Sequence, residues 1–302
     1  MTMSGLATHT WGRYVGDGRQ PSGTTAPAGA ETGRYLADAE LVTAVNTALA
    51  VEQPLLVTGE SGTGKTRLAW SIATELGLGD LLEFHTRSDH QAADVLFAFD
   101  NLRRFYHAQT SDSRAEDPRN YITYRALGQA ILWRGELPRL VLIDEIDKAP
   151  RDFPNDLLDE IDRMAFTVPD TGESFTALHR PIVLITSNSE RQLPDPFLRR
   201  CVFHEIRFPS AQRLAEILQE RLGHLELSSS LASSAIARFL QLRNLPELEK
   251  QPATGELIVW VKVLLQAGVD PAALDRAPLS QLPFPAAIVK TRHDRQVVAR
   301  VS

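Results

Sequence analysis

Residues 59–66 of this 302-residue chain read GESGTGKT, which fits the pattern GxxxxGK[ST]. The segment follows a short apolar run at residues 54–57 and precedes a stretch in which Leu68 and Ile72 recur at helical spacing. A glycine-rich turn between a strand and a helix brings backbone N–H groups and a helix N-terminus onto one phosphate group. This feature therefore predicts a phosphate-binding loop in an α/β fold.

Each part of the loop has an expected role in holding a nucleotide. Glycines allow successive N–H groups to converge on phosphate oxygens, Lys65 reaches the β and γ phosphates, and the Thr66 hydroxyl ligates Mg²⁺. The predicted binding residues are Gly59, Glu60, Ser61, Gly62, Thr63, Gly64, Lys65 and Thr66.

Two more apolar runs of strand length, residues 140–143 and 182–185, lead directly into polar side chains. Asp144 and Glu145 follow the first run, and we expect Asp144 to hold Mg²⁺ through water and Glu145 to polarise an attacking water. Asn188 follows the second run, where its amide can bond both γ-phosphate and water. Taken alone, the acidic pair would be a solvated loop and the asparagine a turn residue. The phosphate-binding loop earlier in the chain favours the functional interpretation.

Arg199 and Arg200 lie in the segment LPDPFLRRC, residues 193–201, shortly after Asn188. A guanidinium supplied across a subunit boundary would stabilise charge on a transferring phosphoryl group. The alternative is a pair of solvated surface charges.

Alternation of apolar strands with helical patterns predicts a doubly wound parallel α/β sheet, because parallel strands need helical crossovers. Beyond Pro209 the apolar residues recur at helical spacing, which predicts a smaller all-helical C-terminal domain. Gly and Pro dominate residues 15–34, so a flexible leader is expected there. The predicted boundaries are a leader at 1–34, a nucleotide-binding core at 35–208, a helical lid at 209–270 and a tail at 271–302, with short strands at 286–290 and 296–301.

Composition narrows the functional classes. The net charge of −6 is scattered rather than gathered in a basic block, so no nucleic-acid partner is expected. Cys201 is the one cysteine, which excludes an intrachain disulfide and points to a reducing compartment. No signal-peptide pattern and no apolar run of membrane-spanning length is found, so we expect a cytoplasmic protein.

Taken together, these motifs resemble those of the MoxR-like AAA+ ATPases over roughly residues 35–268. The likeness depends on residues 59–66 as Walker A, LIDEIDKAP at 142–150 as Walker B, TSNSE at 186–190 as sensor 1, and LPDPFLRRC near the arginine finger. Residues 89–110 occupy the place of the family's insert in the second helix, and residues 166–176 that of its hairpin before sensor 1.

The resemblance implies an ATP hydrolase that uses ATP and Mg²⁺. It also implies a ring, usually of six subunits, that remodels or activates a protein partner, often one with a von Willebrand A domain. Within the LPDPFLRRC segment it favours Arg200 over Arg199 as the finger. One departure is the absence of a clear sensor 2 arginine in the helix after Pro252, where Lys250 or Lys262 are possible substitutes. Two alternatives stay open, a nucleotide-gated scaffold with little turnover and a P-loop kinase.

Overall fold

The computed structural model describes residues 12–22, 24, 27, 34–110 and 112–301. The chain divides into two units. Among the described residues, the first contains those up to residue 27 together with 35–59 and 65–206, and the second contains residues 34, 60–64 and 207–301.

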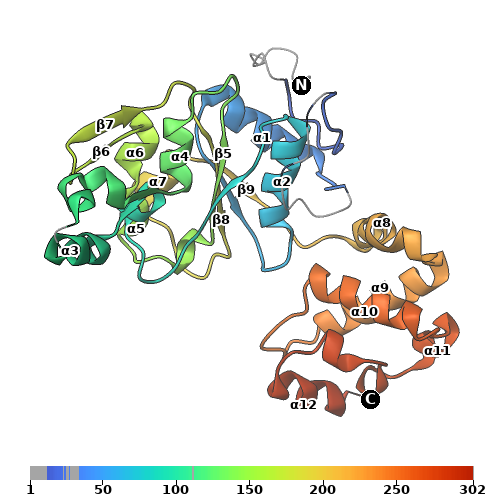
Figure 1. The fold of residues 1–302 in the computed structure, drawn as a ribbon. Coiled ribbons are helices and arrows are strands. Elements are labelled where there is room, and N and C mark those ends of the chain that lie inside the picture. The colour runs from blue at the N-terminus through green and yellow to red at the C-terminus, as the bar shows by residue number, and fades with distance from the viewer. Residues whose placement is uncertain (1–11, 23, 25–26, 28–33, 111, 302) are drawn as a thin grey trace. The chain divides into compact units, whose positions relative to one another are not determined.

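A five-stranded sheet forms the centre of the first unit (Figure 1). Its strands are β1 (Leu55–Thr58), β2 (Leu82–His85), β5 (Leu140–Asp144), β8 (Ile182–Ser187) and β9 (Val202–Glu205). They lie in the order β2–β5–β8–β1–β9, and every neighbouring pair is parallel. Parallel neighbours need crossover connections, and the order places β1 between later strands, so the predicted doubly wound parallel fold is confirmed.

The sheet buries both faces because successive side chains of a strand point in opposite directions. Leu55, Leu140 and Leu184 pack on one face with α1 (Ala39–Val51) and α2 (Lys65–Glu75). The other face, with Leu56, Val141 and Ile185, packs against a second group of helices. These are α4 (Ala126–Leu132), α5 (Phe153–Asp156), α6 (Leu158–Arg163) and α7 (Asp195–Leu198).

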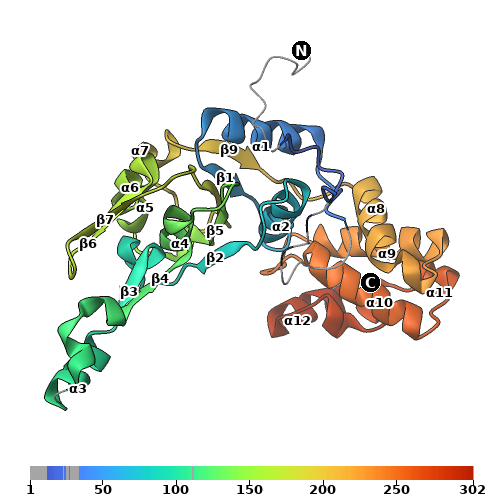
Figure 2. The same ribbon diagram turned by 45° about the horizontal axis from the view of Figure 1, so that its top comes forward.

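Two small antiparallel sheets complete the first unit. One joins β3 (Phe97–Phe99) to β4 (Ile122–Tyr124), on either side of the helix α3 (Asn101–Gln109). The other joins β6 (Ala165–Val168) to β7 (Glu173–Thr176), where the sequence predicted a hairpin. Figure 2 shows α3 at the far end of the β3–β4 pair.

The described part of the predicted leader packs against the core of the first unit. Tyr14 is 0% exposed, and its hydroxyl lies 2.9 Å from Ser71 Oγ. Its backbone N–H donates to Asn46 Oδ1 at 3.1 Å, and the Asn46 amide donates back to the Tyr14 carbonyl at 2.7 Å. Glu75 accepts from the N–H groups of residues 15, 16 and 18. The prediction of a flexible leader is therefore wrong for residues 14–18. Contacts of the buried Tyr14 side chain and of the Glu75 carboxylate stabilise this segment, although its glycine content suggested flexibility.

Helices make up the second unit, as the sequence predicted for residues after Pro209 (Figure 1). They pack around Phe239, Trp260 and Leu264, all fully buried. The helices are α8 (Ala211–Leu222), α9 (Ser229–Arg243), α10 (Thr254–Gln266), α11 (Pro271–Arg276) and α12 (Arg292–Arg300). Within the described residues, no helix combines the length and apolar character that crossing a membrane requires.

The predicted strands in the tail are wrong. Residues 285–287 form a 3-10 turn and residues 292–300 form α12, which begins at Thr291, whose hydroxyl accepts from the Asp294 N–H at 2.9 Å. Val298 packs into the same core as α8–α10, as do Leu274 and Ile288. The tail therefore belongs to the helical unit, and the predicted boundary at residue 270 does not separate two bodies.

Candidate active site

The predicted site residues of the first unit gather at the carboxyl ends of three neighbouring strands. The phosphate-binding loop leaves β1, Asp144 is the last residue of β5, and Asn188 directly follows β8. Because these strands are parallel neighbours, their carboxyl ends lie at one edge of the sheet, where open α/β sheets bind ligands.

The loop has the backbone that its glycines predict. Gly59, Gly62 and Gly64 have φ of 144°, 77° and 93°, values that glycine adopts without steric cost. Lys65 begins α2 and is 6% exposed, and its ammonium donates to the Gly59 carbonyl at 2.8 Å. The loop therefore curls so that the ammonium lies next to the loop's own first carbonyl.

Two oxygen-bearing side chains that could hold Mg²⁺ lie side by side. The Thr66 hydroxyl is 3.2 and 3.3 Å from the two carboxylate oxygens of Asp144. A second hydroxyl, that of Thr186, donates to Asp144 Oδ1 at 2.6 Å and fixes the carboxylate. Oxygen donors are the ligands that Mg²⁺ prefers, so this donor set fits the ion.

Glu145 lies beside this pair with both carboxylate oxygens engaged. The Asn188 amide donates to Oε1 at 2.9 Å, and Lys148 Nζ contacts Oε2 at 2.5 Å. The Glu145 N–H donates to Thr186 Oγ1 at 2.8 Å, which joins the catalytic and metal-binding candidates through one threonine. The Lys148 ammonium, followed by the Asn188 amide, lowers the pKa of Glu145, so the carboxylate is ionised at neutral pH and can accept a proton.

Asp147 is a site residue that the sequence analysis missed. It is 3% exposed, and its carboxylate accepts from the backbone N–H of Asn188 at 3.2 Å and of Glu190 at 3.0 Å. These bonds join the turn after β5 to the loop after β8, and so they fix the position from which Asn188 reaches Glu145. The sequence offered no signal for this role, because the burial of the Asp147 carboxylate, which makes partners necessary, is known only from the fold.

His85 was missed for a different reason. It ends β2, and its Nδ1 lies 3.3 Å from Asp144 Oδ2. The sequence analysis did not identify β2, because its LEFH segment lacks the continuous apolar run of the central strands.

The family comparison is decisive at this point. The model of the "ATPase family associated with various cellular activities (AAA)" matches residues 55–210, more than half of the chain. This chain belongs to the AAA ATPase family.

Other comparisons add little to the placement of this AAA chain. No curated protein matches it. Among solved structures, the "FIGL-1 AAA domain in complex with ADP" matches at 15% identity with a TM-score of 0.41, over 82% of this chain and 71% of that chain.

Neither predicted finger residue joins the site of its own AAA chain. Arg200 Nε forms an ion pair with Asp162 Oδ2 at 2.7 Å and also bonds the Pro196 carbonyl at 3.3 Å. Within the described part of the chain, no ion pair is found for Arg199. Both arginines therefore lie apart from the Asp144–Glu145 cluster in the contacts that the structure describes.

The second unit contains an arginine that the sequence analysis overlooked when it considered Lys250 and Lys262. Arg243, in the last turn of α9, is 6% exposed and forms an ion pair with Glu60, one of the loop residues counted with this unit. Its guanidinium lies 3.6 Å from the centre of the Phe208 ring and donates to the Pro252 carbonyl at 2.7 Å.

Proposed function

We propose that this AAA chain hydrolyses ATP with Mg²⁺. The observation that supports this most directly is the continuous set of bonds from Thr66 through Asp144 and Thr186 to Glu145 and Asn188. A metal-binding pair, an ionised carboxylate and an amide then lie within hydrogen-bond distance of one another, which is what hydrolysis of a phosphoanhydride requires.

In this proposal each residue has one task. Loop N–H groups and Lys65 bind the phosphates, and Thr66 and Asp144 hold Mg²⁺, which neutralises phosphate charge when bound. Glu145 orients the water and accepts its proton, and its lowered pKa keeps the carboxylate ionised at neutral pH. Asn188 orients both the Glu145 carboxylate and the water.

We further propose a MoxR-like hexameric ring in the cytoplasm that remodels or activates a protein partner, such as one with a von Willebrand A domain. In such a ring Arg200, more than Arg199, acts as the finger on the neighbouring subunit's nucleotide. The lack of contact between either arginine and its own chain's cluster supports action in trans. For this role Arg200 has to exchange its pair with Asp162 for phosphate.

One observation favours a second candidate, a nucleotide-gated scaffold with little turnover. Lys148 neutralises Glu145 through a close ion pair, and a carboxylate occupied by an ammonium is a poor base. The scaffold would bind ATP through the same residues and would use binding alone to change its partner contacts.

An assay of phosphate release by the assembled protein with Mg²⁺ and ATP separates the candidates. We expect steady turnover with inorganic phosphate as product. Tight ATP binding without phosphate release would instead establish the scaffold, and transfer of the γ-phosphate to a small acceptor would establish a kinase. A partner can then be sought with Glu145→Gln protein in ATP, with Lys65→Ala protein as the matched control that does not bind nucleotide.

A further inference from the structure

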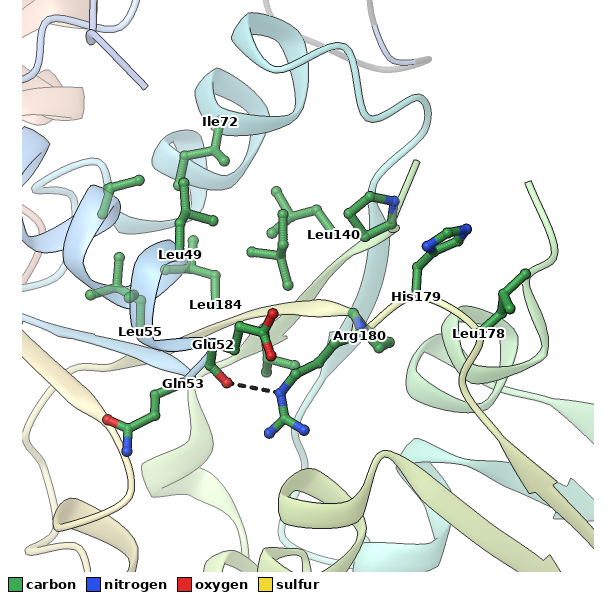
Figure 3. A pocket seen from close by; sticks show the side chains of 16 residues that line it. Leu49, Glu52, Gln53, Leu55, Ile72, Leu140, Leu178, His179, Arg180 and Leu184 are labelled. Atoms are coloured by element: carbon green, nitrogen blue, oxygen red, sulfur yellow. Dashed lines mark hydrogen bonds between the residues drawn. The ribbon is translucent and has the colours of Figure 1, made fainter. Parts of the chain in front are cut away.

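A cavity opens at the opposite ends of the strands that carry the site, and the proposed function does not use it. It lies among the end of α1 and the first residues of β1, β5 and β8, and its volume is about 290 Å³ (Figure 3). Ligand-binding cavities usually begin at about this size, so one small molecule would fill it.

The walls of this cavity are apolar and belong to the packed core of the first unit. Leu49 and Ala48 come from α1, Ile72 from α2, and Leu140 and Leu184 from the central strands. In Figure 3, Leu49 and Leu184 lie next to one another below Ile72, and Glu52 and Arg180 lie below Leu184. A ligand would therefore place an apolar body against this wall.

The rim is fixed by one arginine, so the cavity is largely formed before any ligand enters. The Arg180 guanidinium donates to the carbonyls of Glu52 at 2.8 Å, Ile161 at 3.0 Å and Asp162 at 3.1 Å. These bonds join the end of α1 to α6 through the segment before β8. Since its donors face backbone oxygens, Arg180 braces the rim and is poorly placed to receive an anion.

Glu52 supplies the carboxylate of the lining, which also contains the Arg180 guanidinium and His179. It follows α1 as its C-cap with φ of 54°, and its side chain lines the cavity. Among the residues that the structure describes, none forms an ion pair with its carboxylate. A carboxylate above an apolar wall selects a protonated amine joined to a hydrocarbon body.

We propose that this cavity is a binding site for a small aryl-alkyl or alkyl ammonium compound, whose hydrocarbon part packs on Leu49, Ile72 and Leu184 and whose ammonium pairs with Glu52. The site is separate from the phosphate-binding loop, and the proposal does not depend on ATP hydrolysis.

Methyl-labelled full-length protein, titrated with phenethylamine and followed by NMR, tests this site. We expect saturable shifts of the Leu49, Ile72 and Leu184 methyl signals. Phenethyl alcohol, which is neutral, should bind more weakly, and hydrocinnamate, which is anionic, weakest of the three. Equal binding of all three compounds, or shifts confined to other methyl groups, would overturn the proposal.

Two substitutions test whether the Glu52 charge contributes to binding in this cavity. Glu52→Gln should weaken phenethylamine binding about threefold, the size of an exposed ion pair, and leave phenethyl alcohol unchanged. Glu40→Gln, on the first turn of the same helix and outside the cavity lining, is the matched control and should change neither. If Glu52→Gln leaves amine affinity unaltered, the assigned ligand class is wrong.

Ala48→Leu should fill the cavity and abolish binding of both compounds, while Thr43→Leu on the exposed side of α1 should not. Thermal unfolding shows whether each variant remains folded. Should Ala48→Leu fail to fold, the Glu52→Gln comparison decides the proposal alone. Undiminished binding by folded Ala48→Leu protein would contradict it.

Discussion

At the scale of single residues, the candidate site depends on bonds that cross between neighbouring strand ends. Thr186 bonds both Asp144 and the backbone of Glu145, and Asp147 bonds the backbone that presents Asn188. The bond from the Asn188 N–H to the Asp147 carboxylate is charge-assisted and buried. Such a bond holds a reactive group in a fixed orientation. In the proposed mechanism, Asp147 therefore acts on turnover through Asn188 and not through any contact with nucleotide.

Asp147→Asn tests this positioning role. The variant can accept one N–H but presents an amide to the other donor, so the Asn188 loop should shift and kcat should fall about tenfold at unchanged ATP affinity. Asp159→Asn, which removes an exposed acid paired with Arg163, should leave kcat unchanged. A purely structural Asp147 would lower the melting temperature without separating kcat from ATP affinity.

At the scale of elements, the described leader residues contact the two helices that cover one face of the sheet. Tyr14 is fully buried among side chains of that core and shares hydrogen bonds with Asn46 of α1 and Ser71 of α2. Since α2 begins at Lys65, the leader segment supports the helix that begins with the lysine predicted to bind phosphate.

Tyr14→Ala should lower the free energy of unfolding by about 3 kcal/mol, as expected for removal of a buried aromatic side chain. Tyr14→Phe should cost about 1 kcal/mol, the net value of its hydroxyl bond to Ser71. Urea denaturation of the three proteins measures both. Equal stability of Tyr14→Ala and wild type would restore the flexible-leader interpretation.

Glu75 makes this contact pH-dependent. Burial raises its pKa above the ordinary value of 4.5, so the folded protein binds a proton more tightly than the unfolded chain. Stability should then fall as pH rises from about 4.5 through the raised pKa. Thermal unfolding of Glu75→Gln should lack this decline, and Glu116→Gln, at an exposed position, should retain it. A decline of equal size in Glu75→Gln would assign it to other groups.

The sequence predicted the central strands because their residues are apolar on both faces. The apolar runs at residues 140–143 and 182–185 fit either buried strands or buried helices. Their short length favours strands. β2 was not predicted, because this edge strand contains Glu83 and His85 and therefore lacks a continuous apolar run. Residues 296–301 were mistaken for a strand, since Val297 and Val298 suggest β structure while the helix signal, Thr291 as N-cap, lies six residues earlier.

The residues chosen for their chemistry and chain position, Lys65, Thr66, Asp144, Glu145 and Asn188, come together at one edge of the sheet, and their roles in binding and hydrolysis stay predictions. The structure brings Thr66 to Asp144 and Asn188 to Glu145, although 78 and 43 residues separate them in the chain. Lys148 and Asp147 could not be predicted as partners, because their roles depend on the turn after β5 and on the loop after β8. Sequence spacing alone carries no information on that pairing.

At the scale of the whole molecule, the proposed ring makes each nucleotide site depend on a neighbour. Arg200→Ala should reduce turnover steeply while ATP affinity stays nearly unchanged, and Arg199→Ala should do less. Mixing Arg200→Ala with Lys65→Ala subunits should restore part of the activity, because some interfaces then join an intact loop to an intact arginine. Mixed rings without recovery, or a larger loss in Arg199→Ala, would contradict the assignment.

The central claim is that Glu145 serves hydrolysis and Lys65 serves binding within one site. The direct measurement is ATP affinity and phosphate release for wild type, Lys65→Ala and Glu145→Gln under the same Mg²⁺ concentration. We predict that Lys65→Ala loses ATP binding, whereas Glu145→Gln binds ATP as tightly as wild type and releases no phosphate. Hydrolysis by Glu145→Gln at the wild-type rate would contradict the account.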